Sequence, residues 1–401
     1  MENEHSNDIV FQGHTDSVTS LSYNDQLEHV VSVSCDQTLR VWSLKTREQI
    51  GITSKHATQL NSVNIDSNGL NIISSGMDFR TCLFDYETLK LKFVLLNGGA
   101  VTDHSITKDG NCLVCVTDIS CQMNLWDLRW RKKVFSIPDI HENTPTCCLF
   151  TPNENCVVTT STDGSAKCTD LRSLKTLLTL RDHRNAVSSA AIARDGKLLV
   201  TTSWDKAVHL YDIETGNYRR EGPQILADGH TGSISSCDID DNGIYLATGG
   251  HDKCVILWDT EKKEVKLCLK RHTDWINDVH MTKDGKWILT ASKDRLIRSW
   301  NMEVIERLPF SYLPGNEQTV LTLKYCLLRL TKRKVREMNN CPPGWFPCNT
   351  SYRNRQQQIL KFWHKDFLRK YTNSTLGLTD KLLVSAFCSQ DHLMSSSYLK
   401  L

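Results

Sequence analysis

Histidine, serine and aspartate residues recur along the chain at spacings that could support nucleophilic catalysis. Two of these sets, each with the tryptophan that follows it, are His14, Ser34, Asp36, Trp42 and His272, Ser292, Asp294, Trp300. A serine hydrolase needs one such set, with an exposed serine and hydrogen-bond donors for the oxyanion. Here the set recurs in register along the chain, so a single catalytic centre is not predicted and the protein is not expected to be an enzyme.

Cysteine pairs could also do chemistry, because thiolates bind zinc. Cys112 and Cys115 have C-x2-C spacing, but a structural zinc site needs a second pair at a suitable distance, and none follows. Residues 112–116 are predicted to form a strand, in which an odd separation places the two thiols on opposite faces. We therefore expect core cysteines, no metal site and no cofactor. Sixteen cysteines in a long chain without a secretory signal predict reduced thiols.

An internal repeat organises residues 9–308 and contains all of these sets. Its first mark is a residue pair that ends in histidine or a substitute, and it occurs seven times: Gly13-His14, Lys55-His56, Leu96-Asn97, Ile140-His141, Asp182-His183, Gly229-His230 and Arg271-His272. The second mark is aromatic-acidic in most repeats: Trp42-Ser43, Phe84-Asp85, Trp126-Asp127, Thr169-Asp170, Tyr211-Asp212, Trp258-Asp259 and Trp300-Asn301. The two marks lie 28 residues apart in six repeats and 29 in the third, which predicts a unit of fixed internal geometry.

Each unit contains three short predicted strands, which in the first repeat are Val18–Tyr23, Val30–Ser34 and Leu39–Leu44. Asn-Gly or Asp-Gly dipeptides between the first two strands favour tight hairpin turns. A fourth strand follows, such as Lys175–Leu180. Four strands in about 40 residues, repeated seven times, predict a β-propeller. The expected repeats lie near residues 13–54, 55–96, 97–139, 140–181, 182–228, 229–270 and 271–308.

The two marks, their spacing and an aspartate six residues before the second mark resemble the WD-repeat family over about 300 of the 401 residues. The aspartates are Asp36, Asp78, Asp163, Asp205, Asp252 and Asp294. The resemblance implies an all-β, seven-bladed WD-repeat β-propeller in which His, Asp, Ser and Trp form a structural tetrad within each blade. Such a tetrad satisfies buried polar groups and fixes the loop between blades.

Several repeats depart from the family pattern. In the third, Asp118 lies eight residues before Trp126, and Asn97 replaces the histidine. Thr169 replaces the tryptophan of the fourth repeat, and Gly250 replaces the serine of the sixth. We expect uneven blade stability, with the third and fourth blades weakest.

Two segments compete to complete the seventh blade. The resemblance implies that Ile9, Val10 and Phe11 supply its fourth strand and so close the ring. The segment Val304–Phe310 is the alternative, and the sequence leaves both open.

The resemblance also implies a binding surface on the narrower face of the ring, which we call the loop face. It is built by the loop before the first strand and the loop after the second strand of each blade. Trp204 and Trp275 fall in these loops, together with His251 and Lys293. Large aromatic side chains on a loop face are typical of binding hot spots. The alternative is that each tryptophan only covers the edges of neighbouring blades.

The sequence Trp126-Asp127-Leu128-Arg129 resembles the box with which some WD-repeat proteins dock the damage-binding adaptor of cullin ubiquitin ligases. Arg129 would offer a bidentate fork to a carboxylate of the adaptor. The alternative is an ordinary arginine on the surface of a blade.

The repeats at residues 9–308 follow a short N-terminal lead at residues 1–8. Residues 309–401 do not continue the repeat and form a basic C-terminal tail. The tail holds 14 Lys or Arg and 5 Asp or Glu, whereas residues 1–308 hold 34 and 41. We expect the tail to be poorly ordered or weakly helical, with an amphipathic pattern over residues 356–371. A solvated charge run is the default interpretation; nucleic-acid contact, nuclear localisation and a partner helix are the alternatives.

The composition, 39% hydrophobic and 23% charged, is that of a globular protein, and no apolar run approaches the length of a membrane-spanning helix. We expect an intracellular protein, cytoplasmic or nuclear, that acts as a non-catalytic scaffold and binds a protein or peptide on the loop face. It is expected to be a monomer within a larger complex, without membrane or nucleic-acid contact. The alternatives are a substrate receptor of a cullin-type ubiquitin ligase through Arg129, and nucleic-acid contact through the tail.

Overall fold

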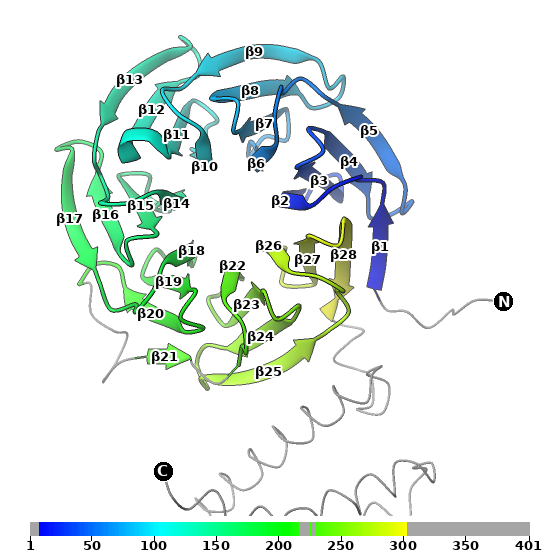
Figure 1. Ribbon diagram of the computed structural model, residues 1–401, viewed down its shortest axis with the longest axis vertical. Coiled ribbons are helices and arrows are strands. Elements are labelled where there is room, and N and C mark those ends of the chain that lie inside the picture. Colours follow the sequence, from blue (N-terminus) through cyan, green and yellow to red (C-terminus); the bar gives the residue numbers. More distant parts are fainter. Residues whose placement is uncertain (1–7, 216–223, 227–228, 303–401) are drawn as a thin grey trace, which may run out of the picture. The chain divides into compact units, whose positions relative to one another are not determined.

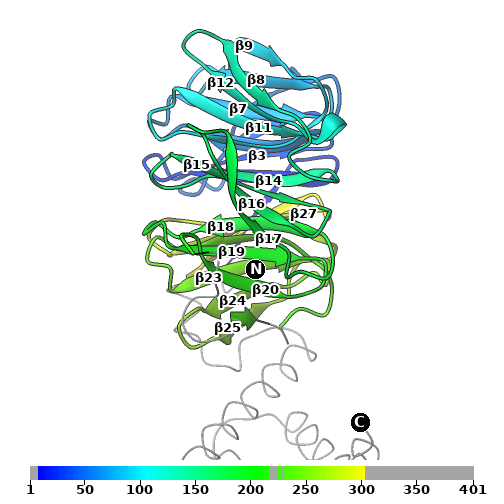
Figure 2. The same cartoon turned by 90° about the vertical axis from the view of Figure 1, so that its left-hand side faces the viewer.

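The computed structural model describes residues 8–215, 224–226 and 229–302. In these residues, seven four-stranded antiparallel sheets, or blades, surround a central axis (Figure 1). Seen edge-on, they form a thick disc (Figure 2). The all-β, seven-bladed architecture predicted from the repeat is therefore confirmed. The expected tail at residues 309–401, its amphipathic segment and its boundary with the body lie outside the described residues.

The strands follow one another from the centre of each blade outward. Blades one to three consist of β2 (Val18–Asn24), β3 (His29–Ser34), β4 (Leu39–Ser43), β5 (Gln49–Thr53); β6 (Leu60–Ile65), β7 (Asn71–Gly76), β8 (Arg80–Asp85), β9 (Leu91–Leu96); and β10 (Val101–Ile106), β11 (Cys112–Thr117), β12 (Met123–Asp127), β13 (Lys132–Ile137). Blades four and five consist of β14 (Pro145–Phe150), β15 (Cys156–Ser161), β16 (Ala166–Asp170), β17 (Lys175–Leu180); and β18 (Val187–Ile192), β19 (Leu198–Ser203), β20 (Val208–Asp212), β21 (Gln224–Leu226). Blades six and seven consist of β22 (Ile234–Ile239), β23 (Tyr245–Gly250), β24 (Val255–Asp259), β25 (Glu264–Leu269); and β26 (Ile276–Met281), β27 (Trp287–Ser292), β28 (Leu296–Asn301), β1 (Asp8–Gln12). A 3-10 turn, η1 (Ile119–Cys121), interrupts blade three.

The N-terminal segment supplies the outer strand of blade seven. β1 pairs antiparallel with β28, with Val10 opposite Arg298. Phe11 is buried against Trp42 of blade one, with ring centroids 5.6 Å apart, and Arg298 Nη1 lies 2.6 Å from Asp8 Oδ2. The first of the two ring-closing segments predicted from the sequence thus occupies this place; the competing segment at residues 304–310 lies outside the described part of the chain.

The core lies between neighbouring blades. The second strand of a blade is buried on both faces because a sheet lies on either side of it: all six residues of β19 are buried. The outermost strands are mostly exposed, as in β17. Trp258, Tyr211 and Phe84, which belong to the second mark of the repeat, are among the largest fully buried side chains.

Hairpin turns join the first two strands of most blades, as the Gly dipeptides predicted. Gly110 and Gly285 have φ values of +70° and +67°, in the left-handed region that glycine tolerates without strain. Each turn is also held by the preceding aspartate, since Asp284 Oδ1 accepts a hydrogen bond from Lys286 N at 3.0 Å.

A bulge at the second residue of the innermost strand recurs in all seven blades. Five of these bulged residues donate a side-chain hydrogen bond to a backbone carbonyl on the innermost strand of the next blade: Thr19, Asn61, Thr146, Ser235 and Asn277. A bulge re-aims one side chain without ending the strand. These contacts therefore link successive blades around the axis.

Two carboxylates on innermost strands add further links. Asp103 in β10 accepts hydrogen bonds from Ser62 Oγ of blade two at 2.7 Å and from Cys148 N of blade four at 2.9 Å. Asp278 in β26 accepts one from Leu21 N of blade one at 2.8 Å. Burial raises the pKa of both carboxyls, that of Asp103 to about 6, because the ionised form loses hydration.

Candidate functional site

In blade seven, a hydrogen-bonded network joins the residues of the repeated set. His272 Nδ1 lies 2.8 Å from Asp294 Oδ2, and His272 Nε2 lies 2.7 Å from Thr290 Oγ1. The same hydroxyl accepts a hydrogen bond from Trp300 Nε1 at 3.2 Å. Burial opposes ionisation of Asp294, but the hydrogen bond and charge of His272 and the Thr273 N–H outweigh it and lower the pKa of the carboxyl to about 2.

Blade one has the same network, and it corrects the expected serine positions. His14 Nδ1 lies 2.9 Å from Asp36 Oδ2, while His14 Nε2 and Trp42 Nε1 both lie 2.8 Å from Ser32 Oγ. Ser34 is not part of this network; its hydroxyl donates to Asp16 O and accepts from Asp36 N.

The members that link histidine to tryptophan are therefore Ser32 and Thr290, two residues before the expected Ser34 and Ser292. Residues two apart in a strand share a face, so the pattern alone does not separate them. Ser34 lies beyond Val33, the last residue of β3 paired with β4, and so its hydroxyl reaches only the loop. Both linking hydroxyls are fully buried, where a substrate has no access.

The departures from the repeat have different consequences for the network. Blade six is complete in spite of Gly250, because Thr248 Oγ1 contacts both His230 Nε2 and Trp258 Nε1 at 2.8 Å. In blade three, Asn97 Oδ1 accepts directly from Trp126 Nε1 at 3.2 Å, and Asp118 instead caps η1. In blade four, the hydroxyl of Thr169 is buried with no hydrogen-bond partner among the described residues.

On the loop face, the structure brings together three residues predicted to bind a partner. The His251 ring stacks on Trp275, with centroids 4.4 Å apart and planes inclined by 15°. Lys293 Nζ lies 4.3 Å from the centroid of the Trp275 ring. Trp275 therefore connects blades six and seven while 42% of its surface stays exposed. Trp204, 43% exposed, follows the second strand of blade five, in the loop that corresponds to those of His251 and Lys293.

Backbone hydrogen bonds fix these loops. The N–H groups of Trp204, His251 and Lys293 donate to the loop that precedes the first strand of the same blade, at 2.8–3.0 Å. Ser233 Oγ of blade six also donates to Trp204 O at 3.3 Å, which ties blade five to blade six. The aromatic side chains thus project from a backbone that is already held in place.

The loop face of blades five to seven carries exposed cations beside paired aspartates, and Asp274 next to Trp275 is a carboxylate without an ion pair among the described residues. The aspartates Asp205, Asp252 and Asp294 are each paired with a buried histidine, and their side chains are only 4–12% exposed. Lys206 and Arg295, by contrast, are exposed on the same loops, next to those aspartates in the sequence. Burial lowers the pKa of His251, which keeps the ring that stacks on Trp275 neutral at pH 7.

Arg129 lies on the opposite face, which we call the turn face because the turns between strands one and two and between strands three and four form it. β12 starts at the loop face and ends at Asp127, two residues before Arg129. The guanidinium is 59% exposed and contacts Asp127 Oδ2 at 2.7 Å. The structure therefore does not bring Arg129 together with Trp204 and Trp275.

Sequence inspection missed a pocket on the turn face between blades two and three. Its lining comes from two successive repeats, and only Gly110, Leu128 and Arg129 belong to motifs recognised in the sequence. Among the described residues, no group of histidine, cysteine and acidic side chains has a metal-binding arrangement, and Cys112 and Cys115 are both free. No helix in the described part of the chain has the length and apolar character needed to span a membrane.

Comparison with known proteins decides the family. The family model for the WD domain, G-beta repeat, matches residues 6–43, 132–170, 174–212, 223–259 and 263–301. The chain is a WD-repeat protein. The repeats of blades one and four to seven thus match the family, whereas most of blades two and three lies between matched segments.

Relatives of this WD-repeat protein include eukaryotic translation initiation factor 3 subunit I of three species. The rabbit protein, from Oryctolagus cuniculus, is 24% identical over 55% of this chain and 70% of its own length. The Mus musculus protein is 24% identical over 53% of this chain and 68% of its own length. The Drosophila erecta protein is 25% identical over 54% of this chain and 71% of its own length.

Proposed function

We propose that this WD-repeat protein is a non-catalytic scaffold that binds a protein or peptide on the loop face of blades five to seven. The observation that carries the proposal is the cluster of Trp275, His251 and Lys293 beside Trp204, with two exposed indoles on fixed loops. Tryptophan is over-represented at the centres of protein interfaces. The buried Ser32 and Thr290 favour this function over hydrolysis.

Preorganisation is the proposed mechanism of binding. The loops are held by backbone hydrogen bonds and by histidine–aspartate pairs, so little conformational entropy remains to be lost when a partner docks. His251 and Lys293 both contact the ring of Trp275, and a partner would pack against the part of the indole that remains exposed. Lys206 and Arg295 would pair with carboxylates of the partner.

The relatives support a role inside a larger assembly. Their name describes them as a subunit of an initiation factor, which fits a propeller that holds other chains together. For this protein we propose only that it is an intracellular monomer that belongs to a multi-protein complex. Residues 203–310 also resemble WD repeat-containing protein 88, a resemblance that adds no activity and no partner.

A second candidate function is docking of a cullin-ligase adaptor through the box that ends in Arg129. The exposure of this guanidinium favours it. Charge reversal in Arg129→Glu should then abolish binding to the purified adaptor and leave the loop-face partner bound. Nucleic-acid contact through residues 309–401 would instead weaken steeply with added salt.

Quantitative affinity purification from cells tests the main proposal. The baits are the full chain, the Trp204→Ala/Trp275→Ala double variant, and a matched control, Leu177→Ala, which removes an exposed apolar side chain from β17. Thermal unfolding confirms that each bait is folded. We expect a partner that is lost with the double variant and kept with the control. If the double variant keeps every partner, the loop face is not the binding site.

A further inference from the structure

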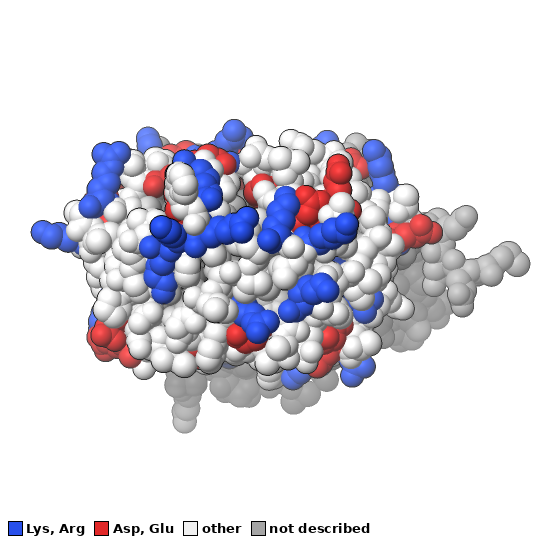
Figure 3. Space-filling model, turned by 90° about the horizontal axis from the view of Figure 1, so that it is seen from above, with Lys and Arg blue, Asp and Glu red and all other residues white. Residues whose placement is uncertain are grey.

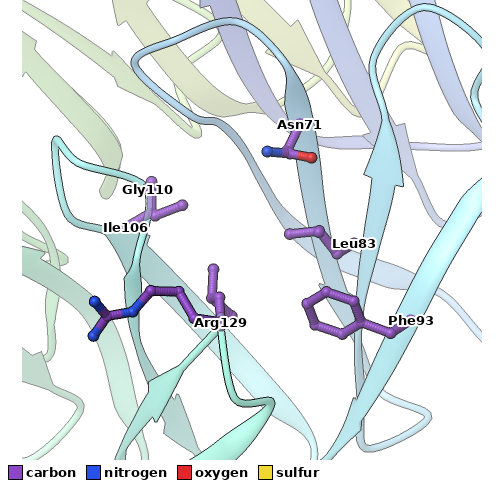
Figure 4. A pocket seen from close by; sticks show the side chains of 7 residues that line it. Asn71, Leu83, Phe93, Ile106, Gly110 and Arg129 are labelled. Carbon is purple, nitrogen blue, oxygen red and sulfur yellow. The ribbon is translucent and has the colours of Figure 1, made fainter.

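A pocket opens on the turn face at the junction of blades two and three (Figure 4). Its lining residues are Asn71, Leu83, Phe93, Ile106, Gly110, Leu128 and Arg129. The volume of about 170 Å³ is smaller than the pockets of several hundred Å³ that hold small-molecule ligands, and it suits a single bulky side chain.

Four of the seven residues that line the pocket are large and apolar. Leu83 in β8 and Phe93 in β9 face Ile106 in β10 and Leu128, and all four belong to the hydrophobic cluster between blades two and three. The pocket is therefore an opening into that cluster, where an apolar side chain would replace water on surfaces that are already part of the core.

Cations surround the mouth of the pocket. The Arg131 guanidinium carbon lies 4.7 Å from the centroid of the Phe93 ring, and Arg129 lines the opposite wall. Lys132 is exposed beside them. Lys92 Nζ contacts Asn71 Oδ1 at 2.6 Å. In the space-filling view of the rim that is uppermost in Figure 1, Lys and Arg side chains gather across the surface (Figure 3).

Two carboxylates next to the pocket are already paired with cations, whereas Asp66 and Asp109 beside Gly110 form hydrogen bonds but no ion pair among the described residues. Asp127 contacts Arg129, and Asp85 contacts Lys92 at 2.9 Å. Neither Arg131 nor Lys132 has an ion-pair partner among residues 8–215, 224–226 and 229–302. Arg131 and Lys132 can therefore pair with carboxylates of a partner, although residues 1–308 as a whole are acidic.

We propose that this pocket binds one bulky apolar side chain from an acidic segment of a partner protein, with carboxylates on either side of it pairing with Arg129, Arg131 and Lys132. The chain's own tail, with 14 basic and 5 acidic residues, carries the wrong charge to be the occupant. A nucleic acid would satisfy the cations but would leave the apolar part of the pocket unfilled. An acidic peptide with an apolar anchor satisfies both.

Binding of a defined peptide to the full chain tests the proposal. The probe is a labelled heptapeptide with a central photo-leucine flanked by three glutamates on each side. Fluorescence anisotropy gives its affinity, and photocrosslinking with mass spectrometry identifies the residues that contact the anchor. We expect crosslinks to the segments around Phe93, Ile106 and Leu128, and an affinity about tenfold lower when alanine replaces the central residue.

Blade four supplies a matched control, because Asp170-Leu171-Arg172 occupies the same turn as Asp127-Leu128-Arg129. Arg129→Glu/Arg131→Glu should weaken binding by about tenfold or more, and Arg172→Glu/Lys175→Glu by less than about twofold. Equal losses in both variants, crosslinks confined to residues 309–401 or to a second copy, unchanged binding of the alanine peptide, or tighter binding of a single-stranded oligonucleotide with the same mutational pattern would each overturn the proposal.

Discussion

Blade six and blade four share a histidine–aspartate pair and a threonine that contacts the histidine, but only blade six has the tryptophan. In blade six, Thr248 accepts from Trp258 Nε1 at 2.8 Å. In blade four, Thr169 fills the tryptophan position. The aspartates nevertheless hold the loop in the same way, since each accepts a hydrogen bond from the residue after its histidine, at 2.8 Å in blade six and 3.0 Å in blade four.

The comparison separates two roles of the network. The histidine and aspartate position the loop at the loop face, and this role survives without an indole. The indole fills the space between blades and satisfies the threonine hydroxyl, and blade four lacks this contribution. The proposed loop-face partner site lies on blades five to seven, where every histidine–aspartate pair is present.

Removing the indole of blade six should have the largest effect on stability and tests the difference between the two blades most directly. Trp258→Ala should lower the free energy of unfolding by about 3–5 kcal/mol, because it leaves a cavity between blades and removes one hydrogen bond of Thr248. Thr169→Ala in blade four should cost about 1 kcal/mol or less. Urea unfolding of the two variants measures both values, and similar costs would show that the indole carries no special share of stability.

Replacing threonine by valine should change the free energy of unfolding in opposite directions in the two blades. Thr248→Val should destabilise by about 1–3 kcal/mol, since it leaves the buried N–H of Trp258 and the Nε2 atom of His230 without their hydrogen-bond partner. Thr169→Val should be neutral or stabilise by up to about 1 kcal/mol, because it removes a buried hydroxyl that has no partner among the described residues. Thermal unfolding compares the two; destabilisation by Thr169→Val would mean that this hydroxyl is satisfied in solution.

The histidine–aspartate pair should show its contribution in the pH dependence of stability. The folded pKa of Asp294, about 2, lies below the unfolded value of 3.8, so its stabilisation is present above pH 4 and is lost as the pH falls toward 2. Asp294→Asn should therefore cost about 1–2 kcal/mol at pH 7 and much less at pH 2.5. A cost that stays constant between these pH values contradicts this account.

Asp103 links blade four to blades two and three. Its contribution to stability should depend on pH in the direction opposite to that of Asp294. Its folded pKa of about 6 lies above the unfolded value, so its stabilisation is complete below pH 4 and is lost as the pH rises through 6. Asp103→Asn cannot ionise but loses one of the two accepted hydrogen bonds, so its free energy of unfolding relative to the unsubstituted protein should rise by about 1 kcal/mol between pH 4 and pH 8. Urea midpoints at the two pH values test this, and the absence of this rise would refute it.

Much of the fold could be predicted because the same sequence pattern recurs in each of the seven blades. The constant distance from His14 to Trp42, found again from His272 to Trp300, defines each blade and its strands. The linking hydroxyls could not be placed, because Ser32 and Ser34 share a strand face and differ only in their position along it. Variation at the first of these positions, serine in blade one and threonine in blade six, hid the signal further.

Features formed between repeats were the hardest to predict. The turn-face pocket combines Phe93 from one repeat with Leu128 from the next, and the stacking of His251 on Trp275 joins loops of two blades. The sequence indicated that both loop residues lie on one face but not which of them touch. The bulged residues such as Thr19 are polar side chains of an ordinary kind, and only the register shift reveals their contact with the next blade.

The pairing of β1 with β28 also determines when the ring can form during synthesis. β1 leaves the ribosome first, but its partner follows about 290 residues later, which at translation rates of about 5–20 residues per second is a delay of roughly 15–60 s. During this interval the nascent chain is an open arc with a strand edge exposed at its growing end, the kind of edge that invites aggregation. The completed protein conceals that edge, but a cell making it must shield the unfinished one.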